Sequence, residues 1–209
     1  MAGAVEVHRQ APEIGVEWGS VGRNKWTPVQ FLDYLGRLEI RVGSVHMPRE
    51  LLADQAALQR IREHADGMGI QLLVSGPSIC PTSRSFNPKN GTAEEQIAAG
   101  LRASRILGAG VLRVTVGELA DRPEIGLHAE STLRVVRGMR SRIQDSGVKL
   151  AVENHAGDFQ ARELKALVEA AGRDVLGVCL DAGNPAWMME DPHLTLEVLG
   201  TYTEITHIR

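Results

Sequence analysis

Three ionisable side chains stand at the ends of predicted strands in the second half of the sequence. Glu153 ends the mostly apolar run 148–152, Asp181 follows Val-Cys-Leu, and His207 lies within Ile-Thr-His-Ile. A lone buried charge is costly, so such groups are normally paired or bound to a metal. Two carboxylates and an imidazole, without a thiolate, suit Mn, Mg, Co or Zn.

The competing interpretation is structural, because a single carboxylate at a strand end often only caps a helix or pairs with a cation. The recurrence on three successive strands favours a shared role. Adjacent strand ends of a parallel barrel lie about 5 Å apart, which brings three such groups within reach of one ion. The spacing therefore predicts one divalent metal ion held by Glu153, Asp181 and His207.

Strand-like runs alternate with helical patterns along the chain. Helix starts are predicted at Thr27-Pro28, at Pro48, at Thr92 with Glu95 in a capping-box spacing, and at Asp191-Pro192. Single helices are expected over 48–67, 124–145 and 161–171, and Gly76-Pro77 is expected to end the third strand. The predicted strands are 14–18, 40–46, 70–75, 111–116, 148–153, 175–180 and 205–208. This alternation indicates a parallel sheet with right-handed crossovers.

Two architectures suit the pattern, an open doubly wound sheet and a (β/α)8 barrel. No GxGxxG or GxxxxGK[ST] motif follows a strand, whereas polar residues gather at several strand ends, which is typical of the barrel. A complete barrel typically needs about 250 residues. We therefore predict one α/β domain over residues 1–209, a C-terminally incomplete TIM barrel that lacks its last strand and last two helices. The first and seventh strands should have unpaired edges.

The composition excludes several classes of protein. The chain has 209 residues, 43% apolar and 23% charged, with a net charge of -3, so it is neither disordered nor suited electrostatically to nucleic acid or an anionic membrane. No apolar run is long enough to span a bilayer, and no signal peptide is expected at the start. Cys80 and Cys179 are expected to be packing residues in a cytoplasmic protein. The expected partner is a small molecule, and homo-oligomers remain open.

The three strand-end motifs carry a resemblance to a known family. Leu-Ala-Val-Glu153-Asn-His155, Gly-Val-Cys-Leu-Asp181-Ala-Gly-Asn184 and Ile-Thr-His207-Ile-Arg resemble the xylose isomerase-like TIM barrel superfamily. That group includes sugar isomerases and epimerases, inosose and 3-dehydroshikimate dehydratases and, more distantly, endonuclease IV. The resemblance implies that Glu153, Asp181 and His207 match three of four ligands of a catalytic divalent metal ion, and that Glu153 is one of two acid/base residues. The fourth ligand, a glutamate on an eighth strand, has no counterpart here.

The function implied by this resemblance is a metal-dependent isomerase, epimerase or dehydratase. Its substrate would be a sugar or polyol-derived ketone that loses a proton next to a metal-bound carbonyl. Asn184 stands where epimerases and endonuclease IV-like members place a histidine, which weakens a standard ketose epimerase and DNA repair alike. The alternatives are an incomplete, non-catalytic barrel with a structural or vestigial metal site or a partner-binding role, and, as a minor one, an endonuclease IV-like enzyme.

Further polar or aromatic residues near the predicted rim are candidates for substrate binding. Each also has a structural interpretation, as a loop, capping or packing residue. Trp18, for example, could form a wall of the pocket or belong to the core. The four other histidines have no such setting and are expected at the surface: His8, His64, His128 and His193. The substrate-binding candidates are His46, His155, Asn184, Trp18 and Glu118.

Overall fold

The computed structural model describes residues 13–46 and 48–208, and within them seven parallel strands form one sheet. Each strand pairs with its neighbour in the sequence, so the spatial order is β1 to β7. The strands are β1 (Gly15–Glu17), β2 (Val42–His46), β3 (Gln71–Ser78), β4 (Val111–Thr115), β5 (Lys149–Glu153), β6 (Leu176–Asp181) and β7 (Thr203–His207). The α-helices are α1 (Pro28–Arg37), α2 (Arg49–Ala53), α3 (Gln55–Gly67), α4 (Ala93–Leu107), α5 (Ile125–Gly138), α6 (Arg140–Ser146), α7 (Ala161–Ala171) and α8 (Pro192–Leu199).

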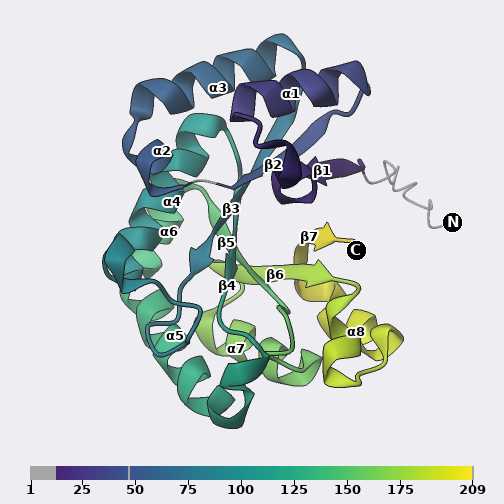
Figure 1. The fold of residues 1–209 in the computed structure, drawn as a ribbon. Helices are drawn as coiled ribbons and strands as arrows, with labels where there is room; N and C mark the ends of the chain where they lie inside the picture. Colours follow the sequence, from purple (N-terminus) through teal and green to yellow (C-terminus); the bar gives the residue numbers. More distant parts are fainter. Residues whose placement is uncertain (1–12, 47, 209) are drawn as a thin grey trace, which may run out of the picture.

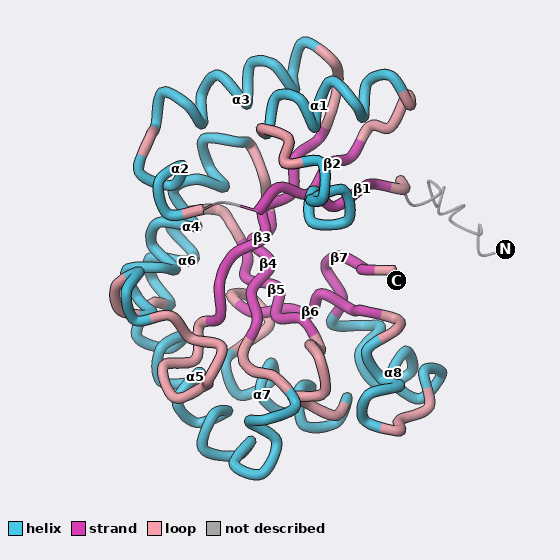
Figure 2. Tube along the Cα trace, in the orientation of Figure 1, coloured by secondary structure: helices cyan, strands magenta, loops and turns pink. Residues whose placement is uncertain are grey.

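The sheet curls into an incomplete barrel with its helices on the outside (Figure 1). Figure 2 shows the strands in the middle and an open side between β1 and β7. The pairings within the described residues run from β1–β2 to β6–β7, and none joins β7 to β1. The predicted incomplete TIM barrel is therefore confirmed, as a seven-stranded parallel half-barrel.

Capping boxes begin two of the helices, at Thr92 as predicted and also at Thr27, where the sequence predicted only an N-cap followed by a proline. The Thr27 hydroxyl accepts a hydrogen bond from the Gln30 amide at 3.3 Å, and the Gln30 side chain accepts one from the Thr27 amide at 2.9 Å. Thr92 and Glu95 make the same reciprocal pair before α4. Each pair satisfies two backbone N–H groups that have no partner within the helix, which fixes where α1 and α4 begin.

The prediction that Gly76-Pro77 ends the third strand is wrong, because β3 continues to Ser78. The pairing of β3 with β4 shifts register between Ser75 and Ser78, so Gly76 and Pro77 lie in a bulge. Proline has no N–H to donate and is tolerated at a bulge, where the ladder is already interrupted. A side chain at Gly76 would lie only 3.0 Å from the Arg113 carbonyl oxygen, which explains the glycine.

Two helices predicted as continuous are each divided. The stretch from Pro48 forms α2 and α3, because Asp54 is non-helical and its carboxylate accepts a hydrogen bond from the Ala57 amide at 2.9 Å. Asp54 is thus an N-cap inside a helical pattern, which the periodicity alone hides. The stretch 124–145 divides at Met139 into α5 and α6.

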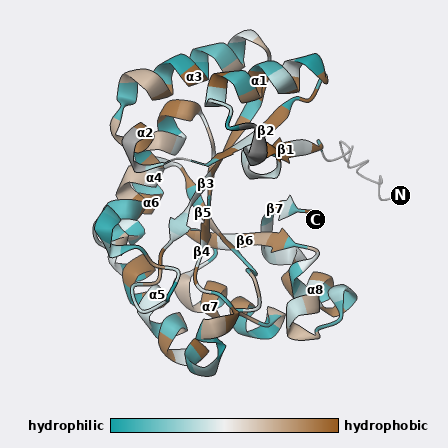
Figure 3. Ribbon diagram, viewed as in Figure 1, coloured by the Kyte–Doolittle hydropathy of each residue, from teal (hydrophilic) through white to brown (hydrophobic). Residues whose placement is uncertain are grey.

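The helices are amphipathic and cover the outer face of the sheet. In α4, the longest of the described helices with 15 residues, Ile97 and Leu101 are buried whereas Arg102 and Arg105 are exposed. Figure 3 shows the apolar colours in the central strands and hydrophilic colours along outer helices such as α3. No helix in the described ranges combines the length and the apolar character needed to cross a bilayer.

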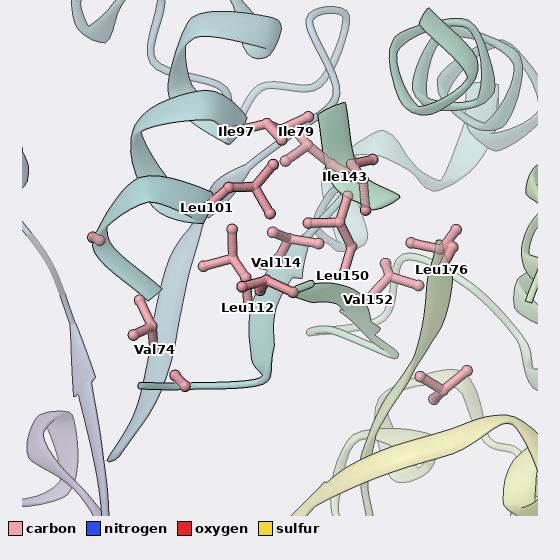
Figure 4. Close-up of a cluster of buried hydrophobic side chains, with 14 of the residues drawn as sticks. Val74, Ile79, Ile97, Leu101, Leu112, Val114, Ile143, Leu150, Val152 and Leu176 are labelled. Atoms are coloured by element: carbon pink, nitrogen blue, oxygen red, sulfur yellow. The ribbon is translucent and has the colours of Figure 1, made fainter. Parts of the chain in front are cut away.

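The main core lies between the sheet and the helices. Successive side chains of a strand point to opposite faces of the sheet, so every second side chain points into this core. Leu112 and Val114 of β4 are fully buried beside Ile97 and Leu101 of α4 (Figure 4). Side chains alternate faces along a strand, so Arg113 points to the opposite, inner face. The same alternation directs Glu153, Cys179 and Asp181 to the inside of the half-barrel, where the candidate site lies.

Candidate metal centre

Glu153, Asp181 and His207 meet at the carboxyl ends of β5, β6 and β7. His207 Nδ1 lies 3.6 Å from Asp181 Oδ2 and 3.8 Å from Glu153 Oε1. One candidate ligand atom from each residue falls within 4.8 Å of the other two. The register of the sheet produces this arrangement, since Glu153 is paired with Cys179 and Asp181 with His207.

The geometry and chemistry of these three groups fit a divalent cation. Ligand atoms bound about 2.1 Å from one ion lie up to about 4.2 Å apart, and both measured separations fall inside that limit. Both carboxylates are fully buried, and His207 Nδ1 is buried without a hydrogen-bond partner in the described structure. A nitrogen and carboxylate oxygens that converge in this way form a suitable donor set.

Asn184 fixes the loop that carries Asp181. Its side-chain amide donates to Glu153 Oε1 at 3.2 Å and to the Asn154 carbonyl at 2.8 Å, and it is buried. Asp181 Oδ1 accepts from the backbone amides of Gly183 and Asn184, at 2.8 and 2.9 Å. Asn184 therefore contacts two of the three candidate ligands, Glu153 and Asp181, and orients them. Its contact with a substrate stays a prediction.

Two charged residues next to the cluster were not among the candidate site residues. Arg113 donates from Nε and NH2 to Glu153 Oε2. Glu17 lies at the end of β1, and its carboxylate is 3.2 Å from His207 Nε2, which links the two edges of the half-barrel. A signal for Arg113 was present in the sequence: a charged residue between two apolar ones in a strand must point away from the helix layer.

Electrostatics keeps Glu153 ionised. Burial by itself raises the pKa of this carboxyl, but His207 and Arg113 outweigh it and hold the pKa below its ordinary value of 4.5. Burial and the neighbouring Glu153 raise the pKa of the Cys179 thiol to about 12, so this thiol stays neutral. The site therefore presents an ionised Glu153 carboxylate and an unreactive cysteine at neutral pH.

A cavity of about 800 Å³ lies on the inner side of the sheet, and His207 is one of its lining residues. Residues of six strands line it, including Glu17, Ser44, Ser75, Arg113 and His207. The Ser44 and Ser75 hydroxyls are 3.0 Å apart. This volume, with carboxylate, hydroxyl and guanidinium groups on its walls, suits a small polar molecule.

His155 is half-buried and bonded within the rim loops. Its Nδ1 lies 2.9 Å from the Gly117 carbonyl oxygen, and its backbone amide donates to Asp158 Oδ1 at 3.0 Å. Asp158 also accepts from the Gly117 amide at 3.1 Å, so the loops after β4 and β5 are tied together. His155 does not line the large cavity, and these contacts are those of a loop-organising residue.

The other three substrate-binding candidates are not among the residues that line the large cavity. Trp18 stacks on Phe31, with ring centroids 6.5 Å apart, and packs against the core. His46 is exposed and lines a separate cavity of about 260 Å³ with Pro48 and Arg102. Glu118 is half-buried, and its backbone amide donates to Asp121. The packing of Trp18 is that of a core residue, and substrate contact by His46 and Glu118 stays a prediction.

The expectation that His128 is a surface residue is wrong. It is 5% exposed, and its Nδ1 lies 2.8 Å from the Thr82 hydroxyl and 3.8 Å from Cys80 Sγ. Both cysteines are buried and unbridged, as expected of packing residues. His193 is exposed and His64 pairs with Asp33, whereas His8 lies outside the described residues. The burial of His128 could not be predicted locally, because it depends on the loop after β3, which packs against α5.

The loss of the His207 proton should make the metal-free protein less stable at alkaline pH. The carboxylates of Glu153 and Glu17 raise the pKa of its imidazole from 6.5 to about 9, against the opposing effect of burial. A raised pKa in the folded state stabilises the fold fully below pH 6.5, and this contribution disappears as the pH rises through 9. With a chelator present, we expect the free energy of unfolding to fall over this range, by well under about 3 kcal/mol because solvent screens the partly exposed imidazole, and the melting temperature to fall with it.

The control for this pH dependence is His207→Asn, which removes the titrating group. Its melting temperature should change much less between pH 6.5 and 9. An equal slope in both proteins would show that other groups cause the dependence.

Comparison with known families gives this geometry its context. A sequence profile described as xylose isomerase-like TIM barrel matches residues 39–209, most of the chain. The chain belongs to the xylose isomerase-like TIM barrel family. The resemblance inferred from the three strand-end motifs is thereby confirmed, and the matched range contains all three candidate ligands of this family member.

Individual relatives of this xylose isomerase-like chain are distant. It is 23% identical over 154 residues to 3-oxo-isoapionate decarboxylase of Pectobacterium atrosepticum, a match covering 74% of this chain and 50% of the relative. The chain thus spans about half the length of that curated relative. The crystal structure of a xylose isomerase domain protein from Planctomyces limnophilus matches with a TM-score of 0.74 and 18% identity, over 96% of this chain and 74% of that one.

A second solved structure has the same fold. D-Psicose 3-epimerase from Clostridium cellulolyticum H10, crystallised with D-tagatose, matches with a TM-score of 0.73 and 15% identity. The match covers 93% of this chain and 72% of the epimerase. At these identities the two structures show the shared barrel fold.

Proposed function

We propose that this protein is a divalent-metal-dependent isomerase or epimerase that acts on a sugar or another polyol-derived ketone. The observation that carries the proposal is the convergence of Glu153, Asp181 and His207, the last of which also lines the 800 Å³ cavity. Family membership supports it, since the D-psicose 3-epimerase named above shares the fold. The Mn, Mg, Co or Zn ion expected from the donor set would be held by these three side chains.

The chemistry assigned to the residues is proton transfer at the carbon next to a carbonyl. A divalent cation, when bound, supplies positive charge that stabilises the negative charge developing on a substrate oxygen. Glu153 is the proposed base, because it is buried, ionised and fixed between Arg113 and Asn184. A base held in one position needs no reorganisation when it accepts the proton.

The cavity walls supply the proposed contacts to the substrate. The adjacent hydroxyls of Ser44 and Ser75 can donate to or accept from sugar hydroxyls, and Arg113 can only donate. Asn184 remains a candidate through its side-chain oxygen, which is buried without a hydrogen-bond partner in the described structure. These groups would orient a polyhydroxylated ketone rather than a hydrocarbon.

Proton exchange tests this function without knowledge of the product. The protein is incubated in D2O with Mn²⁺ and a panel of ketoses and keto-inositols, and loss of the proton next to the carbonyl is followed by NMR. We expect exchange for at least one substrate, and an exchange rate at least about 100-fold lower in Glu153→Gln. Equal exchange by both proteins would contradict the role of Glu153.

Decarboxylation is the second candidate, favoured by the similarity to 3-oxo-isoapionate decarboxylase. Loss of CO2 from a 3-oxo acid leaves negative charge on the same kind of oxygen as proton removal does, so one site can serve both reactions. Adding 3-oxo acids to the panel and measuring CO2 release separates the two. Release of water would indicate a dehydratase, and metal binding without any turnover would favour the non-catalytic interpretation.

A further inference from the structure

Arg113 is a permanent positive charge inside the half-barrel, next to a proposed metal ligand. Its side chain is 14% exposed and comes from the middle of β4. Nε and NH2 both contact Glu153 Oε2, whereas Oε1 of the same carboxylate faces His207 and accepts from Asn184. The two oxygens of Glu153 thus have separate partners.

We infer that Arg113 is the internal counter-ion of Glu153, which holds the ligand set in place without metal and thereby weakens the binding of a divalent cation. This inference rests on the metal site of the proposed function. It concerns a residue that the strand-end motifs did not include and that was not among the site residues predicted from the sequence. Arg113 acts through Glu153 and is therefore a positioning residue.

The charges around the site support a counter-ion. Glu153 and Asp181 are fully buried, and Glu17 is about one-fifth exposed, so three carboxylates share a small region. Arg113 is the one arginine or lysine among the described residues that line the cavity. Its guanidinium cannot lose its proton in a protein, so it offsets one of these charges at every pH. Without it, a buried carboxylate would lack this compensation, which is strongly destabilising.

The positive charge of Arg113 must also oppose the binding of a metal ion. A cation bound to Glu153, Asp181 and His207 would share the Glu153 carboxylate with the guanidinium, and like charges so close repel each other strongly in a partly buried site. Removing Arg113 therefore destabilises the metal-free state more than the metal-bound state. Metal affinity should rise as a result, whereas a residue that only orients Glu153 would lower the affinity when removed.

Metal titration of three full-length variants tests the inference. Arg113→Met removes the charge, Arg113→Lys keeps it, and Arg122→Met removes an arginine that pairs with Glu163 and lies outside the cavity lining. Mn²⁺ affinity is measured by calorimetry, and the visible spectrum of bound Co²⁺ reports the ligand set. We expect Mn²⁺ to bind at least about tenfold more tightly to Arg113→Met, and within about threefold of wild type to the other two. The Co²⁺ spectrum should be unchanged in all three.

Thermal unfolding of the metal-free proteins gives an independent measurement. Arg113→Met should melt at a lower temperature than wild type, and the double variant Arg113→Met, Glu153→Gln should recover part of the loss, because the uncompensated carboxylate is gone. Unchanged or weaker Mn²⁺ binding by a folded Arg113→Met overturns the inference, as does a double variant that melts no higher than Arg113→Met. A wild-type protein that binds no Mn²⁺ instead overturns the proposed function, and the melting temperatures then decide whether Arg113 is the counter-ion.

Discussion

Asp181→Asn is expected to lower the affinity for Mn²⁺ by at least about 100-fold and to abolish metal-dependent proton exchange. The substitution changes little else. Asp181 Oδ1 accepts from the backbone amides of Gly183 and Asn184, and an asparagine side-chain oxygen can accept both bonds. The other oxygen, 3.6 Å from His207 Nδ1, becomes an amide nitrogen that cannot bind a cation. The loop is kept while one ligand and one negative charge are lost.

Asp174→Asn is the matched control. Asp174 pairs with Arg140 on the surface, and its side chain is 45% exposed. The same chemical change there should leave Mn²⁺ binding, measured by calorimetry, within about twofold of wild type, because surface ion pairs contribute little. If Asp181→Asn bound Mn²⁺ as tightly as Asp174→Asn, Asp181 would not be a ligand.

Leu112→Ala is expected to lower the free energy of unfolding by about 3 kcal/mol. Leu112 is fully buried at the centre of the layer between β4 and α4 (Figure 4). Removing three carbons leaves a cavity that the closely packed sheet and helix cannot fill by collapsing. Urea unfolding measures the change, and Leu127→Ala, at a side chain 58% exposed, should cost less than about 1 kcal/mol.

Gly100 in α4 offers a sharper test of the same packing. A Cβ at Gly100 would lie 2.7 Å from Leu112 Cδ2, so Gly100→Ala should destabilise the wild-type protein although alanine is the better helix former. In the Leu112→Ala background the added methyl meets no such atom and should stabilise the protein. The same sign in both backgrounds would contradict the contact between Gly100 and Leu112.

Much of the fold could be predicted because local rules dominate it. The alternation of strand and helix and the capping pairs at Thr27 and Thr92 depend on residues close in the sequence. Where tertiary contacts compete with local signals, the predictions were wrong. Gly76-Pro77 is a strong turn signal, but pairing with β4 absorbs it as a bulge, and Asp54 caps a helix within a run that is periodic throughout.

The candidate site divides in the same way. The three proposed ligands were found because each is a polar residue at the end of a buried strand, a one-dimensional signal. Arg113 and Glu17 were not among the predicted site residues because they come from strands far away in the sequence, and only the pairing and curvature of the sheet place them beside Glu153 and His207. Trp18 and His46 satisfied the same rim criterion but lie elsewhere, since a strand end does not show which way a side chain points.

By itself, then, the sequence determined the parallel half-barrel, its order of strands, and the donor types at the ends of β5, β6 and β7. These follow from periodicity and from the cost of leaving charges unpaired in a buried strand. Tertiary structure alone decided which charges surround the donors and which walls enclose the cavity. Electrostatic energy depends on distances in space, and residues 40 positions apart, such as Arg113 and Glu153, become neighbours only when the sheet forms.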